Sequence, residues 1–215
     1  MNIQDIWEGF SAEQCSYLAD IIKHSDAKSV CELGTFVGST AKKIWGGIKD
    51  LDKELYLVDN YSFLPGDKRE KFFNLIKHSI DPTTKNIKCI LEDSHTYEWT
   101  KHNFVIFGHH DYDHMIPDLQ KLFDSKVDYV VLGDGTPRCF LRTKATYELI
   151  SNLSGGGLVP RFYLQGLIVL SRKNIMCSLP TEQDFFFGHK INFMPKPKGR
   201  YLKALNEIKK IYSVG

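Results

Sequence analysis

The sequence lacks a long apolar run, a strong charge of one sign and an evident targeting segment. Its 215 residues contain no stretch of 18 consecutive apolar residues, so we expect no membrane-spanning helix. Residues 1–5 do not form the basic segment before an apolar block that marks a signal peptide. The formal net charge of +2 indicates no partner by itself.

Cysteine is also sparse. The five cysteines are odd in number, widely spaced and without a C-x-x-C pair: Cys15, Cys31, Cys89, Cys139 and Cys177. This usage is typical of a reduced intracellular protein, so we expect a cytoplasmic location. No internal repeat or low-complexity segment occurs, and the 42% hydrophobic content is that of an ordinary globular protein.

Residues 30–41 have the pattern of a strand that runs through an acid and two glycines into a helix. Glu32 lies near the carboxyl end of the predicted strand 29–33, and ligands of open α/β sheets bind beyond such ends. Gly34 and Gly38 have no Cβ, so the chain is able to turn tightly there and a bulky ligand to come close.

The same stretch favours a ligand with a cationic end. Ser39 and Thr40 are expected to cap the following helix, so that its amides near Gly38 point into the same crevice. The pattern E-x-G-x-x-x-G differs from the dinucleotide pattern G-x-G-x-x-G, because Glu32 would repel a phosphate and attract an ammonium group. S-adenosylmethionine carries both an amino group and a sulfonium. The alternative is a strand-to-helix turn that binds no ligand.

Helical and strand patterns alternate along most of the chain. The first helix follows a capping box formed by Ser11 and Gln14. The expected helices are 12–24, 41–48, 67–80, 115–123 and 144–153, and the expected strands are 29–33, 54–59, 86–91, 104–107 and 127–132. Such alternation implies right-handed βαβ units and a parallel sheet covered on both faces.

The alternation stops after residue 153. Residues 158–163 and 167–172 are two β-rich runs separated by a few residues, so they are expected to pair as an antiparallel hairpin. The predicted fold is therefore an α/β three-layer sandwich. Its sheet is mostly parallel and seven-stranded with a C-terminal antiparallel hairpin, and helices cover both faces.

Acidic residues recur at the predicted strand ends, in the order Glu32, Asp59, Asp93 and Asp134. The fourth strand leads into Phe107-Gly108-His109-His110-Asp111-Tyr112, with Asp118-Leu119 further on. With the glycine loop, these motifs resemble those of class I, Rossmann-like S-adenosylmethionine-dependent methyltransferases. From about residue 28 to about residue 172, the chain is most similar to small-molecule O-methyltransferases of the macrocin and catechol type.

This resemblance implies where the methyl donor would bind. The Asp59 carboxylate would accept both ribose hydroxyls, and Asp93 would take the adenine amino group. The full set of implied donor contacts is Glu32, Gly34, Thr35, Gly38, Ser39, Asp59, Asn60, Asp93 and Ser94.

Histidines and aspartates cluster after the fourth strand. A neutral imidazole at His109 or His110 has a suitable pKa to remove the proton of an acceptor hydroxyl, so these two are the candidate catalytic residues. The alternative is a polar loop and helix cap, with the aspartates placed favourably at a helix start.

Metal dependence is questioned by one residue. Phe107 stands where metal-dependent members of the family have an aspartate, and phenylalanine offers no oxygen ligand for magnesium. No metal ligands are therefore assigned, although Asp134, Asp111 and His110 leave a different site open. Phe107 also motivates a second interpretation, in which the chain binds S-adenosylmethionine without catalysis.

A third interpretation comes from the same histidine cluster. His109-x-Asp111-x-Asp113-His114 resembles the H-x-H-x-D-H loop of metallo-β-lactamase-like hydrolases, whose metals activate water. Beyond His114 only His189 remains, so the further histidines of such a site are missing. This interpretation also leaves Glu32 and the glycine loop unexplained.

Residues 1–173 are expected to form the methyltransferase domain with its N-terminal helix, and residues 174–215 an extension packed on or near the active-site side. The end of the chain is basic, but no Asn-Pro-Pro-Tyr-like motif argues for a nucleic-acid acceptor. We expect an enzyme that transfers a methyl group from S-adenosylmethionine to a small-molecule or sugar hydroxyl. A membrane partner is not expected, and a homo-oligomer is left open.

Overall fold

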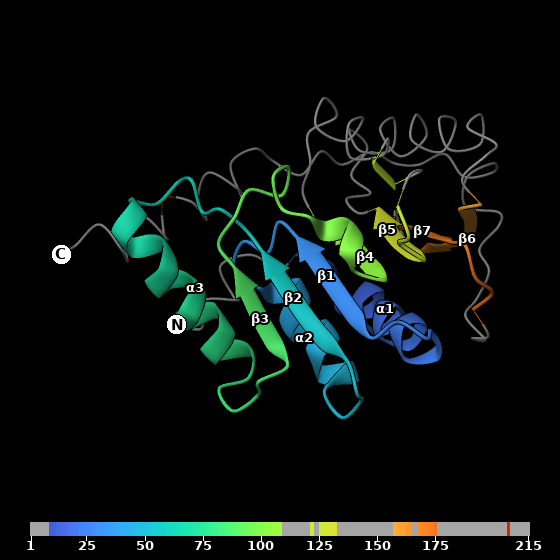
Figure 1. Cartoon of the computed structure of the whole chain (residues 1–215). Helices are drawn as coiled ribbons and strands as arrows, with labels where there is room; N and C mark the ends of the chain where they lie inside the picture. The colour runs from blue at the N-terminus through green and yellow to red at the C-terminus, as the bar shows by residue number, and fades with distance from the viewer. Residues whose placement is uncertain are drawn as a thin grey trace, which may run out of the picture.

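A seven-stranded sheet is the centre of the structure, a computed structural model that describes residues 9–108, 121–122, 125–132, 157–164, 167–175 and 206. The strands lie in the order β3-β2-β1-β4-β5-β7-β6 (Figure 1). Their bounds are β1 Ser29–Leu33, β2 Glu54–Val58, β3 Ile87–Ile90, β4 Phe104–Phe107, β5 Tyr129–Leu132, β6 Val159–Leu164 and β7 Leu167–Ser171.

The directions of the strands confirm the predicted sheet. Strands β1 to β5 pair in parallel, whereas β7 pairs antiparallel with both β5 and β6. The last two strands therefore form the expected hairpin, and its second strand is the one that joins the parallel part. Every residue of β4, β5 and β7 is buried, as expected for apolar strands that are covered on both faces.

Three helices cover one face of the sheet: α1 (Ala12–His24), α2 (Ser39–Ile48) and α3 (Gly66–Ile80). Their apolar side chains share one core with alternate residues of the strands, and α1 and α2 lie behind the sheet in Figure 1. The other face packs against Leu122 and the short 3-10 helix η2 (Trp99–Lys101) within the described residues. The predicted helices 115–123, apart from residues 121–122, and 144–153 lie outside these residues.

The helix starts show where local sequence signals succeed and fail. The Ser11 hydroxyl accepts from the Gln14 amide at 3.1 Å and the Gln14 side chain accepts from the Ser11 amide at 2.8 Å, which confirms the capping box. The expected caps of α2 are wrong. Gly38 is the N-cap residue without a side-chain cap bond, and the Thr40 hydroxyl accepts instead from the Phe10 amide at 3.0 Å.

The apolar face of α3 also differs from the prediction. Helical spacing predicts that Phe72, Leu75, Ile76 and Ile80 share one apolar face, but Leu75 is exposed and Phe73 is buried together with Phe72 and Ile76. The rings of Phe72 and Phe73 both pack edge-on against the buried Tyr61 ring, at centroid distances of 5.0 Å, and this contact accounts for the burial of Phe73. The helical spacing of apolar residues alone did not show that Phe73, and not Leu75, lies on the buried face.

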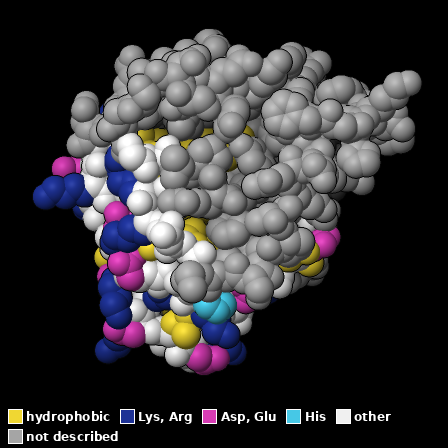
Figure 2. All heavy atoms as spheres, turned by 90° about the vertical axis from the view of Figure 1, so that its right-hand side faces the viewer, with side chains coloured by type: hydrophobic (Ala, Val, Ile, Leu, Met, Phe, Trp, Pro, Cys, Tyr) yellow, Lys and Arg dark blue, Asp and Glu magenta, His cyan; other side chains and the backbone are white. Residues whose placement is uncertain are grey.

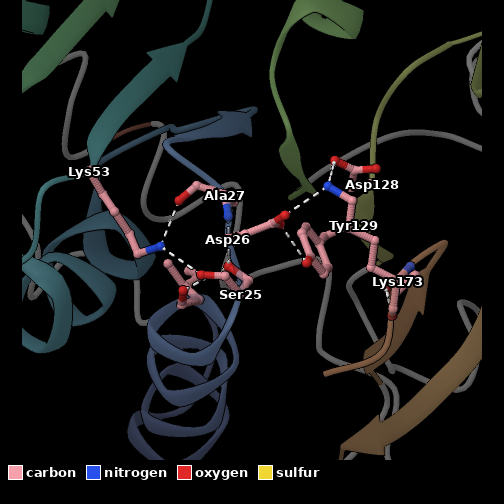
Figure 3. Close-up of polar contacts among 9 residues, drawn as sticks. Ser25, Asp26, Ala27, Lys53, Asp128, Tyr129 and Lys173 are labelled. Carbon is pink, nitrogen blue, oxygen red and sulfur yellow. Dashed lines mark hydrogen bonds and ion pairs between the residues drawn. The ribbon is translucent and has the colours of Figure 1, made fainter. Parts of the chain in front are cut away.

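A polar network joins the amino ends of the parallel strands (Figure 3). The buried Lys53 ammonium donates to the carbonyls of Ser25 and Ala27, at 3.1 and 2.6 Å. Asp26 accepts from the Tyr129 hydroxyl and from the Lys173 ammonium, both at 2.8 Å. Bonding by Lys173 and then Tyr129 lowers the pKa of Asp26. The connection between α1 and β1 is thereby tied to β5 and to the end of β7.

Arg172 completes this amino-end network. Its guanidinium donates to the carbonyls of Val127 at 3.0 Å, Leu122 at 2.8 Å and Ser125 at 3.3 Å. One side chain therefore holds three carbonyl groups on the segment that enters β5. The extension predicted after residue 173 lies almost entirely outside the described residues. Within the described chain, no helix is both long and apolar enough to cross a membrane.

Replacement of Arg172 by lysine is expected to lower the free energy of unfolding by about 1 to 2 kcal/mol, because lysine keeps the charge but cannot span three carbonyls. Urea titration measures the change. Arg69→Lys is the matched control, since Arg69 donates its Nε to a single carbonyl, that of Leu64, at 3.0 Å. Equal losses in the two variants would contradict the role given to Arg172.

Candidate functional site

The order in which the chain adds strands to the sheet reverses at β1, because β2 and β3 lie on one side of it and β4 and β5 on the other. The carboxyl ends of β1 and β4 therefore form a topological switch point. Ligands of open α/β sheets bind outside the carboxyl ends of strands at such a switch point. The carboxyl ends of β1 and β4 lie close together, as the hydrogen bond from the Gly108 amide to the Leu33 carbonyl at 2.9 Å shows. A Cβ on Gly108 would lie 3.0 Å from the Leu33 oxygen and 3.1 Å from the Gly34 oxygen, so a side chain here would force the backbone at the end of β1 to shift.

Glu32 is the acid at this switch point. Its side chain is only 3% exposed, and its Oε2 atom has no hydrogen-bond partner within the described structure. Burial and, second, the negative charge of Asp59 raise the pKa of Glu32 to about 8, while Thr35 acts in the opposite direction. A buried carboxyl oxygen without a partner is costly, and a bound cation would remove that cost. The residue therefore fits the ammonium group of a ligand.

Asp59 lies directly after β2 and connects two loops. Its Oδ2 atom accepts from the Phe36 amide and its Oδ1 atom from the Tyr61 amide, both at 2.8 Å. Phe36 and Tyr61 have left-handed backbones, with φ of 51° and 45°. This conformation costs a non-glycine residue about 1 kcal/mol or more. Burial raises the pKa of Asp59 despite these bonds.

Asn60 and Asp93 extend the connection to the end of β3. The Asn60 side-chain amide donates to Asp93 Oδ2 at 2.8 Å, and the His95 backbone amide donates to Asp93 Oδ1 at 2.9 Å. The Asn60 oxygen accepts from the Ser62 amide at 2.9 Å. The predicted ligand acids therefore also organise the loops in which they lie.

Aromatic rings support these loops from the face that carries the three helices. The Tyr61 ring packs edge-on against Phe63 at 5.9 Å, and Phe63 packs against Phe36 at 5.8 Å. Tyr61 is completely buried, and its hydroxyl has no partner in the described structure. Sequence analysis missed the roles of Phe36 and Tyr61. The spacing of Asp59 and Tyr61, typical of an Asx turn, was the available signal.

The structure brings most of the predicted site residues to one edge of the sheet. Glu32, Gly34 and Thr35 lie at the end of β1, Asp59 and Asn60 after β2, and Asp93 and Ser94 after β3. Their contacts with a donor remain a prediction, as does a contact by the buried Ser39. The candidate bases His109 and His110 and the acid Asp134 lie outside the described residues.

Phe107 ends β4 and is buried. Its ring packs edge-on against Trp99 at a centroid distance of 5.3 Å. The described residues contain no group of three histidine, cysteine or acidic side chains placed to hold a metal ion. Phe107, which the resemblance to metal-dependent methyltransferases places at a metal-ligand position, therefore contributes to packing between η2 and β4.

Gly38 is required by packing as well as by backbone conformation. Its φ is 74°, and a Cβ there would lie 2.6 Å from Cγ2 of Ile76 in α3. The absence of a side chain at Gly38 thus lets α3 approach the start of α2. Packing against α3 therefore explains the glycine at position 38 without a bound ligand.

Gly38→Ala is expected to destabilise the protein by about 1 kcal/mol or more, because alanine disfavours this φ and would displace Ile76. Gly46→Ala is the matched control, since a Cβ at Gly46 within α2 meets no atom within 4 Å. It is expected to stabilise the protein by about 0.5 to 1 kcal/mol through helix propensity. Thermal unfolding measures both, and equal effects would contradict the packing at Gly38.

Glu32→Gln is expected to stabilise the unliganded protein increasingly as the pH rises from about 5 to about 8. The folded-state pKa of Glu32, about 8, is above its unfolded value, so the wild type loses stability as the pH rises through this window. The slope for one group is at most about 1.4 kcal/mol per pH unit. Urea titrations of the wild type and variant at several pH values measure the difference.

The exposed Glu98 provides the control, because Glu98→Gln makes the same chemical change outside the core. This control is expected to leave the pH profile of unfolding unchanged. A constant difference between the wild type and Glu32→Gln across the pH range would show that Glu32 does not titrate as a buried group.

Comparison with known proteins returns similar folds. No protein-family model and no curated protein sequence matches the chain. The methyltransferase PaMTH1 of Podospora anserina, solved with S-adenosylhomocysteine, has a TM-score of 0.52 and 12% identity over 76% of this chain and 78% of its own. An O-methyltransferase from Bacillus cereus, also solved with S-adenosylhomocysteine, has a TM-score of 0.52 and 10% identity over 79% and 90%.

The mitomycin 7-O-methyltransferase MmcR has a TM-score of 0.50 and 11% identity over 74% of this chain. The match covers 52% of MmcR, so this chain spans about half of that protein's length. At these identities the likeness concerns the fold. The chain has the Rossmann-like fold that these methyltransferases share, which confirms the expected resemblance at the level of the fold.

Proposed function

We propose that the protein is a methyltransferase that binds S-adenosylmethionine and methylates oxygen on a small molecule. The observation that carries this proposal is the buried Glu32 carboxyl group, whose Oε2 atom lacks a partner at the switch point of the sheet. An ammonium group would supply the missing partner. The solved methyltransferases with the same fold, two of them with S-adenosylhomocysteine bound, support this ligand.

S-adenosylmethionine would supply a methyl group that its sulfonium already activates. The task left to the chain is to orient the donor and the acceptor and to accept a proton. Glu32 would hold the ammonium group, and the loops carrying Asp59 and Asp93 would hold the nucleoside part. His109 or His110 would take the proton from the acceptor hydroxyl.

A small-molecule acceptor is supported by the MmcR fold match, because MmcR is by name a mitomycin O-methyltransferase. Figure 2 shows lysine, arginine and acidic side chains interspersed on the described part of one face. A nucleic-acid acceptor would favour basic side chains gathered on one face. Phe107, buried against Trp99, continues to argue against the family's magnesium site.

Phe107 also favours the second candidate, a protein that binds the donor without catalysis. The fold and Glu32 fit both candidates equally, so turnover distinguishes them. The metal-hydrolase interpretation explains neither the buried Glu32 nor the glycine loop, and its histidine cluster lies outside the described residues.

S-adenosylhomocysteine is expected to bind the wild type in calorimetric titration and to release a proton near neutral pH. An ammonium group favours ionised Glu32, whose unliganded pKa is about 8, so affinity should increase from about pH 6 to about pH 7.5. Glu32→Gln should weaken binding at least about tenfold and remove this pH dependence, whereas Glu98→Gln should change neither. Absence of binding at millimolar ligand would exclude the donor site.

Turnover is tested with radiolabelled S-adenosylmethionine and a library of hydroxyl compounds, with and without a chelator. His109→Ala and His110→Ala are compared in parallel with the wild type. Loss of turnover in one of them, with donor affinity retained, would identify the base. Donor binding without transfer to any acceptor would favour the non-catalytic candidate.

A further inference from the structure

We propose that Asp59 is a positioning residue that holds the loops after β1 and β2 in the conformation to which the donor binds. This inference rests on the proposed function for the identity of the ligand. One carboxylate reaches both loops, because its two oxygens accept from the Phe36 and Tyr61 amides at 2.8 Å each. The resemblance to methyltransferases assigns Asp59 a different role, as a ligand of the ribose.

The two bonded amides belong to residues with an unfavourable backbone. Within the described chain, Phe36 and Tyr61 are the non-glycine residues with positive φ. Asparagine and aspartate enter this region more easily because their short side chains bond locally, but phenylalanine and tyrosine have no such group. Both loops therefore need support from another residue, and Asp59 contacts both.

Ring packing does not provide the same support. The Phe36 and Tyr61 rings each pack against the Phe63 ring, at centroid distances of 5.8 and 5.9 Å, and these contacts fix where the side chains lie. Edge-on packing does not determine the direction of the backbone amides, whereas two hydrogen bonds to one carboxylate do. The rings thus anchor the loops, and Asp59 orients their backbones.

The orientation matters because of what the loops carry. Phe36 lies between Gly34 and Gly38 in the loop that follows Glu32, so its backbone sets the path of that loop. Asn60 lies between Asp59 and Tyr61 and donates to Asp93 at 2.8 Å. The Asp59 carboxylate with its two bonded amides, of Phe36 and Tyr61, is here called the Asp59 clamp. This clamp therefore places groups from the ends of three strands around one ligand position.

The clamp leaves room for a ribose contact. An ionised carboxylate has about four lone-pair positions, and the backbone amides of Phe36, Tyr61 and Asn60 use up to three of them. The two roles are nevertheless separable by experiment. A clamp acts in the ligand-free protein, whereas a ribose ligand acts only when the donor is bound.

The test measures amide hydrogen exchange by NMR in isotope-labelled wild type, Asp59→Asn and Asp52→Asn, without ligand. The two amides bond to different carboxylate oxygens, and asparagine replaces one of these oxygens by a donor group, so it cannot keep both bonds in this geometry. The Phe36 and Tyr61 amides should exchange slowly in the wild type, and at least one should exchange about tenfold faster or more in Asp59→Asn. The exposed Asp52 receives the same substitution as control and should change neither amide. Unchanged protection in Asp59→Asn would overturn the clamp.

A measurement on the wild type covers the case in which Asp59→Asn does not fold. The amide proton shifts of Phe36 and Tyr61 should follow the titration of the Asp59 carboxyl carbon, because protonation weakens both hydrogen bonds. The neighbouring carboxyl groups of Glu32 and Asp93 are followed in the same spectra. Amide shifts that follow another carboxyl group, or none, would overturn the proposal.

S-adenosylhomocysteine titration then connects the clamp to binding. Asp59→Asn should lower the affinity at least about tenfold, and Asp52→Asn should not change it. If Asp59→Asn lowers the affinity but leaves the exchange rates of both amides unchanged in the ligand-free protein, Asp59 is only a ligand contact. Failure of the wild type to bind would overturn the proposed function and the donor part of this inference, while the exchange rates would still decide on the clamp itself.

Discussion

A carboxyl group buried at the switch point of the sheet is the constraint around which the site is organised. Glu32 lies on a central strand, and the glycine loop follows it directly. Burial and the nearby Asp59 both disfavour its ionised form. A chain under selection for stability alone would be expected to place an apolar side chain there, since replacing an unpaired buried polar group is often stabilising. The unfavourable position is explained if a cationic ligand completes it.

The opposite rim of the sheet shows how the same chain treats charged groups that serve stability. Lys53 is buried, and its ammonium donates to two carbonyls. Arg172 donates to three. At the carboxyl rim, by contrast, the Glu32 carboxyl and the Tyr61 hydroxyl are buried with an unpartnered oxygen. Among the described residues, Lys53 and Arg172 at the amino rim are thus satisfied, whereas the buried acid Glu32 keeps one unpartnered oxygen at the rim where ligands of such sheets bind.

Sequence reasoning succeeded where one local signal determined the result. The capping box at Ser11 depends on two residues three positions apart, and the final hairpin on two β-rich runs separated by a short turn. It failed where tertiary packing decided. The Phe72 and Phe73 rings both pack edge-on against Tyr61, from the loop after β2, and all three are buried in the same core. Gly38 is glycine partly because Ile76 approaches it, and nothing in the spacing of these residues indicates that contact.

The candidate site shows the same limit in a more specific form. Glu32, Asp59 and Asp93 lie at or after the carboxyl ends of β1, β2 and β3 as predicted, since the carboxyl ends of parallel strands meet at one edge. Their hydrogen bonds were not, because a carboxylate serves a ligand and a backbone amide with the same chemistry. The left-handed backbones of Phe36 and Tyr61 have no signature in residue type, as aromatic residues seldom adopt them. Where residue type disfavours the observed backbone, the residue that stabilises it must be found in three dimensions, and here both loops lead to Asp59.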